Sequence, residues 1–550
     1  GKHKIPFTTG ILIGIGETRL ERIESLLKIK QIQEKYGHIQ EIIIQNFRAK
    51  PNTIMQDSRE PDFKDLQWTI AVTRLIFGSK MSVQVPPNLS PGNLVGLIAA
   101  GINDWGGVSP LTPDHVNPEA PWPHLDKLYE HTELAGKTLV ERLTAYPQYI
   151  RRSDLWIDEK FRNDLLARSD SEGLARQDEW YSGESSEVPE RDKNLITGPT
   201  VAVDGDLLKI FKKIEKGVLI SKKDVLDLFN SRGRQFSSIC NFANELREDV
   251  CGDTVSFVIN RNINYTNVCY FKCQFCAFSK GKTSENLRGK PYNLSREEIK
   301  RRVKEAWDRG ASEVCMQGGI HPHYSGETYL EIVRTVKEAV ADIHLHAFSP
   351  LEIWQGAATN KTSIKEFLLE LKNAGLDTLP GTAAEILDDS VRKIICADKI
   401  NTQQWIEVMR QAHSIGFKTT STIMYGHVET AENWANHLIA IRNLQVETGG
   451  FTEFVPLPFV AEEAPIFLKG KARKGPTFRE AILMHAVARI LFFRVINNIQ
   501  ASWVKMGHEA VVAALHAGVN DLGGTLMNES ITRAAGASHG QETHPEVMLE

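Results

Sequence analysis

The sequence predicts an α/β protein in which a complete (β/α)8 barrel follows the C-terminal half of a second, homologous barrel. Runs of β-type residues alternate with amphipathic helical stretches over residues 255–525, the pattern of a β/α barrel. Three segments near the N-terminus resemble three segments of that region, in the same order and at a nearly constant separation, so we expect the two ends to be homologous. The pairs are Thr8–Thr18 with Thr420–Thr430, Gln45–Phe47 with Thr452–Phe454, and Ala100–Gly107 with Ala517–Gly524.

The complete barrel is expected to have eight strands. Amphipathic helices are expected between them, several ending at a glycine suited to a C-cap, such as Gly310, Gly375 and Gly416. Eight β/α units within about 290 residues are typical of a closed barrel, whose active site lies at the carboxyl ends of the strands. The expected strands lie near 255–262, 312–319, 342–349, 377–384, 418–427, 451–458, 498–505 and 519–525, and the helices include 296–309, 329–340, 364–374 and 403–414.

The N-terminal copy offers only the last four strands of such a barrel. Half a barrel leaves two unpaired sheet edges, so we expect this domain to be truncated or completed by another chain. The chain also begins at Gly1 and not at Met, which suggests missing upstream sequence, and no cysteine precedes Cys240. The expected strands are 6–14, 39–47, 81–86 and 102–108, followed by a helical tail at 124–145.

The chain therefore divides into three expected parts. Residues 1–150 form the half barrel, and residues 206–540 form the helices that precede the complete barrel together with that barrel. The segment between them, residues 151–205, is rich in charge, serine and glycine, and is expected to be a solvated linker with one short helix.

Composition excludes several classes of protein. A net charge of -4 gives no reason to expect a nucleic acid or an acidic membrane as partner. No apolar run reaches the roughly 18 residues that a membrane span needs. Seven cysteines, three of them in one loop, do not form a disulfide framework and favour a reducing intracellular compartment, expected to be the cytoplasm.

The three clustered cysteines, Cys269, Cys273 and Cys276, follow the first strand of the complete barrel at the spacing CxxxCxxC. Three thiolates can hold three irons of a 4Fe-4S cluster and leave the fourth iron open, whereas electron-transfer clusters use four cysteines. An open iron can bind S-adenosylmethionine, whose reductive cleavage gives a 5′-deoxyadenosyl radical that abstracts hydrogen from a substrate. A structural zinc site, which needs a fourth ligand, and a chance cluster are the alternatives.

The cysteine loop is the signature of the radical S-adenosylmethionine enzymes. Together with Asn260–Cys269, Cys315–Gly319 and Leu379–Glu385, and with the half barrel upstream, it resembles the bifunctional FO synthase family of deazaflavin biosynthesis. The resemblance implies one 4Fe-4S cluster in this chain, S-adenosylmethionine, and an electron donor such as ferredoxin or flavodoxin. It further implies that the complete barrel cleaves L-tyrosine and transfers a 4-hydroxybenzyl unit to 5-amino-6-(D-ribitylamino)uracil. The half barrel resembles the cyclising subunit, but it lacks that subunit's cysteine loop, which puts the cyclising (ammonia-lyase) activity in doubt.

The resemblance also assigns cofactor-binding residues. Phe275 is expected near the adenine, with a core aromatic as the alternative. The segment Gln317, Gly318 and Gly319 at the end of the second strand is expected to approach the methionine amino group, with a plain turn as the alternative. Gly426 belongs to a glycine-containing segment that borders the adenine in this family.

Three further residues are candidates for catalysis. Glu385, just beyond the fourth strand, is expected to meet a substrate or ribose hydroxyl, or else to be a first-turn helix acid. His344 and His346 are two residues apart on the third strand and therefore point the same way, so they are candidates for handling the protons of tyrosine.

Two other functions stay open. An aminofutalosine synthase-like radical enzyme of menaquinone biosynthesis would share the cysteine loop but gives no reason for the upstream copy. A non-catalytic metal-binding scaffold would need a fourth metal ligand near the three cysteines.

Overall fold

The computed structural model describes residues 1–109, 111–198, 203, 205–279 and 290–549. The chain forms two compact units, which we describe separately. The first comprises Gly1–Arg162 with Gly173–Ala175, and the second comprises Asn163–Glu172 with Arg176–Glu550.

The first unit is built on a three-stranded parallel sheet in the order β1-β2-β3. The four expected strands correspond to these three strands and an isolated parallel bridge between Gln84 and Asp104. Apolar residues on β2 and β3 are fully buried against the helices that follow. The elements are β1 (Phe7–Ile13), α1 (Arg19–Tyr36), β2 (Ile39–Asn46), α2 (Phe63–Phe77), β3 (Ser82–Gln84), a 3-10 turn (Pro87–Leu89), α3 (Leu94–Ala100), α4 (Leu125–Leu134), α5 (Pro147–Ile150) and α6 (Ser153–Trp156).

One expectation for this unit is wrong in its extent. The C-terminal helix, expected over 124–145, ends at Leu134, and no helix covers residues 135–145. Gly136 has a left-handed φ of 68°, and Lys137 N donates to Thr132 O, so the chain turns away directly after the helix.

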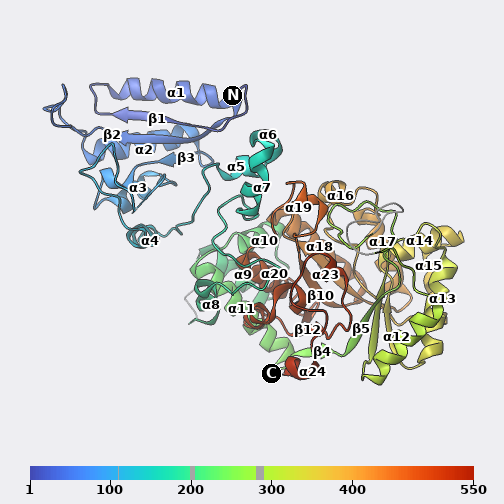
Figure 1. Cartoon of the computed structure of the whole chain (residues 1–550). Coiled ribbons are helices and arrows are strands. Elements are labelled where there is room, and N and C mark those ends of the chain that lie inside the picture. The colour runs from blue at the N-terminus through green and yellow to red at the C-terminus, as the bar shows by residue number, and fades with distance from the viewer. Residues whose placement is uncertain (110, 199–202, 204, 280–289, 550) are drawn as a thin grey trace. The chain divides into compact units, whose positions relative to one another are not determined.

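The second unit is a parallel β/α barrel (Figure 1). All eight expected strands are present in it. Seven strands pair in the order β11-β10-β9-β8-β7-β6-β5. The ring closes through β12, which pairs with β4 and is bridged to β11 by Gln500 and Asp521. The strands are β4 (Ser256–Val258), β5 (Asn260–Asn264), β6 (Glu313–Gln317), β7 (His344–Ala347), β8 (Thr378–Leu379), β9 (Lys418–Tyr425), β10 (Phe451–Pro458), β11 (Asn498–Ile499) and β12 (Asp521–Gly524).

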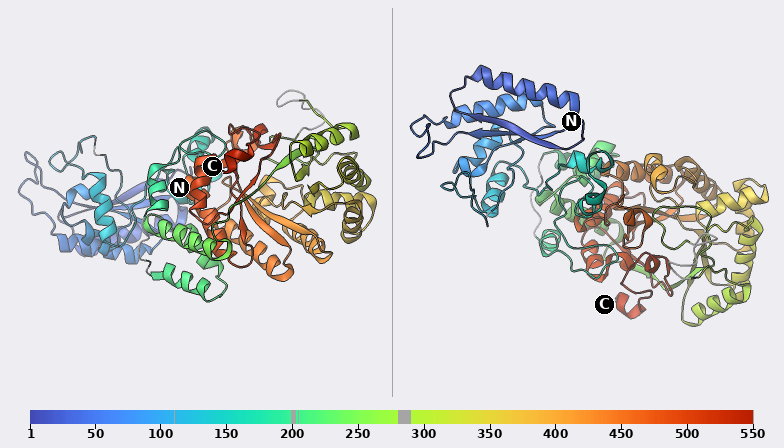
Figure 2. Two further views of the ribbon diagram at one scale, coloured as in Figure 1. Left: turned by 90° about the horizontal axis from the view of Figure 1, so that it is seen from below. Right: turned by 45° about the horizontal axis from the view of Figure 1, so that its top comes forward.

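Helices pack on the outside of these strands. The yellow-green to yellow helices α12 to α15 line one side of the barrel in Figure 1, and Figure 2 gives two further views. Their starts follow from sequence: Ser349 with Glu352, and Ser363 with Glu366, form capping boxes at α14 and α15. The last residues of the first unit and the first residues of the second share α7 (Glu159–Ala167). The other helices of the second unit are α8 (Glu190–Thr197), α9 (Gly205–Glu215), α10 (Lys222–Phe229), α11 (Arg234–Cys251), α12 (Arg296–Asp308), α13 (Gly326–Ala339), α14 (Pro350–Asn360), α15 (Ile364–Ala374), α16 (Asp389–Ile395), α17 (Thr402–Ser414), α18 (Ala431–Thr448), α19 (Pro465–Leu468), α20 (Phe478–Leu491), α21 (Trp503–Met506), α22 (His508–Leu515), α23 (Ile531–Ala534) and α24 (Pro545–Leu549).

The expectation of a solvated linker over residues 151–205 is wrong for its central part. Trp180 is 1% exposed and packs edge-on against Phe478, and Ser169 and Asp170 are also buried. Charge and serine content predicted solvation, but these polar groups find partners on the barrel instead. Residues 199–202 and 204 lie outside the described residues. No helix in the described residues is both long and apolar enough to cross a membrane.

Candidate active site

The three cysteines of the CxxxCxxC loop line one cavity of about 260 Å³ at the carboxyl ends of the barrel strands. Each strand from β6 to β10 contributes residues to it at, or directly after, its carboxyl end, the position where barrel active sites form. The residues used in the argument below are Cys269, Cys273, Phe275, Cys276, Gln317, Gly318, Gly319, Glu352, Ala383, Glu385, Lys399, Phe459, Val460, Lys505 and Thr532.

Backbone hydrogen bonds hold the cysteine loop from two sides. Tyr270 N donates to Ile320 O at 3.1 Å, beside the end of β6. Gln274 N donates to Ile395 O at 2.8 Å, and Lys272 N donates to Asp398 Oδ2 at 2.8 Å. The loop is therefore fixed by the segments that follow the second and fourth strands of the barrel.

Gly318 and Gly319 are required for the close approach of β6 to this loop. A Cβ atom on Gly319 would lie 2.3 Å from Val268 O, and one on Gly318 would lie 2.3 Å from the Tyr265 ring. Any side chain at either position would displace the chain that carries Cys269. The two glycines line the cavity and also let the cysteine loop pack.

The donor set fits an iron-sulfur cluster with an open iron, since three thiols from one loop face one cavity. Burial raises the pKa of Cys273 to about 12, and the nearby Lys399 opposes this shift. A thiolate here therefore needs positive charge beside it, which a cluster's irons and Lys399 would supply. Among the described residues no three His, Cys, Asp or Glu side chains form a site for a single metal ion.

Glu385 and Lys399 form an ion pair on the cavity wall. Lys399 Nζ lies 2.7 Å from Glu385 Oε1 and 5.3 Å from the centre of the Phe275 ring. Glu385 has a φ of 45° and Ala383 a φ of 62°, a left-handed conformation that non-glycine residues rarely adopt. Such strain is common where a backbone must present groups to a ligand.

Glu352 is a second carboxylate in the cavity. Its Oε2 accepts from Ser349 N at 2.7 Å and from Ser349 Oγ at 2.6 Å, and the Tyr265 hydroxyl donates to its Oε1. Burial raises its pKa, whereas these donors act in the opposite direction. Glu352 thus completes the capping box of α14, contacts Tyr265 directly after β5, and lines the cavity.

The structure brings eight of the eleven residues named from sequence into this cavity, and it separates the other three from it. His344 and His346 do point the same way, since both contact Thr378 Oγ1 at 2.8 Å. They lie on β7 at the level of the first residue of β8, whereas the cavity begins beyond the ends of these strands. Alternation predicts the face of a strand but not the depth along the barrel.

Gly426 follows β9 and does not line the cavity. Its φ is 102°, and a Cβ atom there would lie 2.2 Å from Pro476 Cδ. The absence of a side chain at this position lets the loop of residues 473–477 pack against the end of β9.

Sequence reasoning missed Glu352, Lys399 and Lys505, which supply the remaining charges of the cavity. Glu352 had a usable signal, because the pattern Ser349-x-x-Glu352 directly after the third strand predicts a capping box at the carboxyl end of the barrel. Lys399 lies beyond α16 and Lys505 within α21, and no motif marks either one.

A parallel β/α barrel with a CxxxCxxC loop at the carboxyl ends of its strands defines a radical S-adenosylmethionine enzyme. In agreement, the model of the radical SAM superfamily matches residues 263–440, and that of the CofH/MqnC C-terminal region matches residues 448–545. The chain is 44% identical to the FO synthase of Nocardia farcinica over 98% of its own length and 68% of that protein. It is 45% identical to the FO synthase of Mycobacterium leprae, with 98% and 67% covered. The chain belongs to the FO synthase family.

A further relative matches a smaller part of the chain. The 5-amino-6-(D-ribitylamino)uracil–L-tyrosine 4-hydroxyphenyl transferase of Methanocaldococcus jannaschii is 48% identical over 58% of this chain and 89% of its own length. This chain spans about two thirds of the length of the FO synthases. The match to the FO synthases runs through nearly the whole chain. It does not test the expected truncation of the first unit, which stays a prediction.

Proposed function

We propose that the barrel of the second unit cleaves L-tyrosine by radical chemistry and transfers its 4-hydroxybenzyl group to 5-amino-6-(D-ribitylamino)uracil, a step in forming the deazaflavin FO. The observation that carries this proposal is the cavity itself, where three thiols from one loop meet a wall of paired charges. The name of the Methanocaldococcus jannaschii relative, which is 48% identical, supplies the substrates.

In this proposal Cys269, Cys273 and Cys276 hold a 4Fe-4S cluster, one per chain. When bound, the cluster supplies the electron that cleaves S-adenosylmethionine and so starts hydrogen abstraction. Lys399 holds Glu385 in place, and Glu385 is oriented to accept a hydroxyl of the cofactor or substrate. Gly318 and Gly319 leave backbone exposed for the methionine end of the cofactor. An electron donor such as ferredoxin or flavodoxin completes the system.

The remaining cavity residues exclude water and hold the substrate. Phe275 presents an aromatic face beside Lys399, which suits stacking against a base. Phe459 and Val460 form an apolar wall after β10. A dry wall prevents a reactive radical from being quenched before it meets its substrate.

The test is anaerobic reconstitution of the full chain with iron, sulfide, S-adenosylmethionine and a reductant. With L-tyrosine and 5-amino-6-(D-ribitylamino)uracil together, mass spectrometry should detect 5′-deoxyadenosine and the hydroxybenzyl adduct in equal amounts. Omission of the uracil should abolish the adduct. An adduct formed instead with a purine nucleoside precursor of menaquinone would assign the chain to the alternative pathway, and no turnover of tyrosine would contradict the proposal.

A further inference from the structure

Among the described residues, one cationic side chain of the cavity has no counterion. The described charged residues that line the cavity are Glu352, Glu385, Lys399 and Lys505. Lys399 pairs with Glu385, and Glu352 accepts from Ser349 and from Tyr265. Lys505 remains.

Lys505 lies in α21, directly after β11, on the cavity wall. Its Nζ donates to Thr532 Oγ1 at 3.2 Å, and within the described ranges no carboxylate lies close enough for an ion pair. Glu529, the acid that most influences it, accepts instead from the backbone of Ile531 at 3.0 Å and of Thr532 at 2.8 Å. Burial lowers the pKa of Lys505 because the ammonium has lost water, and the charge of Glu529 only opposes this shift.

Two neighbouring residues that precede the barrel, Ser182 and Gly183, contact both this lysine and the apolar wall formed by Phe459 and Val460. Gly183 N donates to Lys505 O at 2.7 Å, and the Ser182 hydroxyl donates to Phe459 O. Gly183 has a φ of 87°, and a Cβ atom there would lie 2.7 Å from Val460 Cγ1. Residues 169–172 and 176–184 of the second unit, which we call the strap, thus contact three residues that line the cavity.

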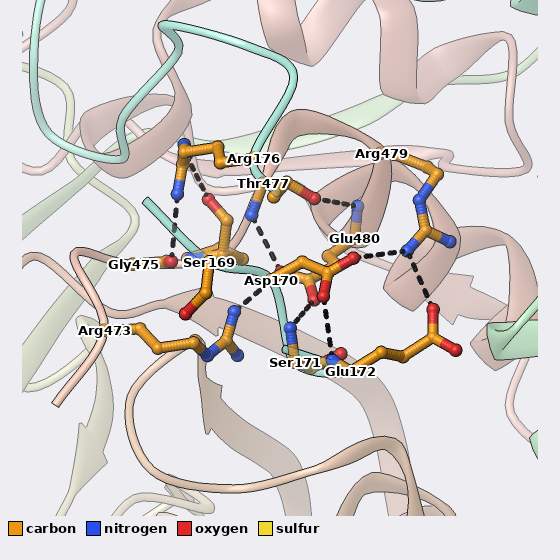
Figure 3. A network of polar contacts seen from close by, with 12 residues as sticks. Ser169, Asp170, Ser171, Glu172, Arg176, Arg473, Gly475, Thr477, Arg479 and Glu480 are labelled. Atoms are coloured by element: carbon orange, nitrogen blue, oxygen red, sulfur yellow. Dashed lines mark hydrogen bonds and ion pairs between the residues drawn. The ribbon is translucent and has the colours of Figure 1, made fainter. Parts of the chain in front are cut away.

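Buried polar contacts anchor the strap upstream, as Figure 3 shows. Asp170 Oδ2 lies 2.6 Å from Arg232 Nη2 and 3.8 Å from Arg479 Nη2. Ser171 N donates to Glu480 Oε1 at 2.7 Å. Arg176 Nη1 donates to Gly475 O at 3.3 Å. Because the strap is anchored, it holds the backbone of Lys505 in one position, and the side chain of Lys505 lines the cavity.

We propose that Lys505, positioned by the strap, binds the α-carboxylate of the amino-acid substrate. This inference rests on the proposed function, which makes that substrate tyrosine. An ammonium with unused donors in a partly dry cavity is suited to a carboxylate, and the charge-assisted hydrogen bond would orient the amino acid relative to the cysteine loop. S-adenosylmethionine carries the same group, so the test must distinguish the two.

The test compares tyrosine with tyramine, which lacks the carboxylate, in the reconstituted full chain. Lys505→Met should raise the KM for tyrosine by about 10- to 100-fold, the loss expected for one hydrogen bond to a charged group. The KM for tyramine should change less than about 2-fold, since no contact is lost. Lys505→Arg should restore part of the preference for tyrosine. Lys304→Met, on the exposed face of α12, is the matched control and should behave as the wild type.

Three results would contradict the assignment of Lys505. A Lys505→Met variant that keeps the wild-type preference for tyrosine over tyramine overturns the assignment, as does a raised KM for S-adenosylmethionine with the tyrosine KM unchanged. A wild-type chain that turns over neither amine overturns the proposed function and this inference with it.

The strap is tested by Gly183→Ala against Gly217→Ala. Both glycines have positive φ, but a Cβ atom on Gly217 would have no neighbour within 4 Å. Gly183→Ala alone should raise the KM for tyrosine severalfold while the KM for S-adenosylmethionine stays constant. Ser182→Ala removes a contact without strain and should act in the same direction. Identical kinetics for both glycine variants, with Ser182→Ala at wild-type level, would overturn the positioning role.

Discussion

The ammonium of Lys399 lies 2.7 Å from the carboxylate of Glu385, and both side chains are largely enclosed by the cavity that the cysteine loop lines. Such a pair contributes little net stability as long as it is intact, because desolvation offsets the attraction. Removing only one of the two charges is costly, because the other charge is then buried without a partner. The pair therefore fixes the position of Glu385 next to the cysteine loop.

Lys399→Met should destabilise the metal-free chain by about 3 kcal/mol, because it leaves the Glu385 carboxylate buried without a partner. The double variant Lys399→Met/Glu385→Gln should recover a large part of that loss, since the amide carries no charge. Urea unfolding followed by circular dichroism measures both. A double variant no more stable than the single one would contradict the pairing.

Reconstituted wild-type chain should contain about 4 irons, since one three-cysteine loop holds one cubane cluster. Cys273→Ala should lose the absorbance of the cluster near 400 nm, roughly the region of iron-sulfur charge-transfer bands, and should not form 5′-deoxyadenosine. The barrel should stay folded, because the loop lies at the carboxyl face and not among the strands. Cys251→Ala is the control: this thiol, at the end of α11, donates to Asn497 O, does not line the cavity and should be dispensable. An active Cys273→Ala variant would refute the cluster assignment.

Inside the barrel, burial together with the nearby Asp521 and Glu313 raises the pKa of Glu453 from 4.5 to about 8. Between these two values the folded chain holds a proton that the unfolded chain has released. Stability should therefore fall as pH rises through this window, by about 1.4 kcal/mol per pH unit from this group alone, and should level off above it. Glu453→Gln should remove that slope, as measured by urea unfolding at several pH values. An unchanged slope in the variant would show that Glu453 is not the group responsible.

Asp170→Asn should loosen the strap, because it removes the negative charge that Arg232 and Arg479 share. We expect a loss of about 3 kcal/mol in unfolding free energy, as for other broken buried ion pairs, and faster trypsin cleavage after Arg168 and Arg176. Glu187→Gln, at an exposed position nearby, should change neither. Cleavage of Asp170→Asn at the wild-type rate would mean that the strap does not depend on this contact.

The sequence predicted the barrel well because its signal is local. Strands at 418–425 and 451–458 and helices at 364–374 and 402–414 lie where periodicity and capping residues placed them, within one or two residues. The same reasoning failed for the segment at 169–182, where a run of serine, aspartate and glutamate is typical of a solvated linker. Its partners, Arg232 and Arg479, come from elements far along the chain, and composition contains no information about them.

The sequence by itself determined the cysteine loop, the eight strands and the carboxyl-end position of the site, since each depends on spacing within one short stretch. Only the tertiary structure decided which charges meet there. Lys399, Glu352 and Lys505 come from three different β/α units and converge because the closed ring brings the ends of distant strands together. The tertiary structure also separated His344 and His346 from the cavity. The depth of a residue in the barrel depends on the register of its strand against the neighbouring strands, which one strand's sequence does not specify.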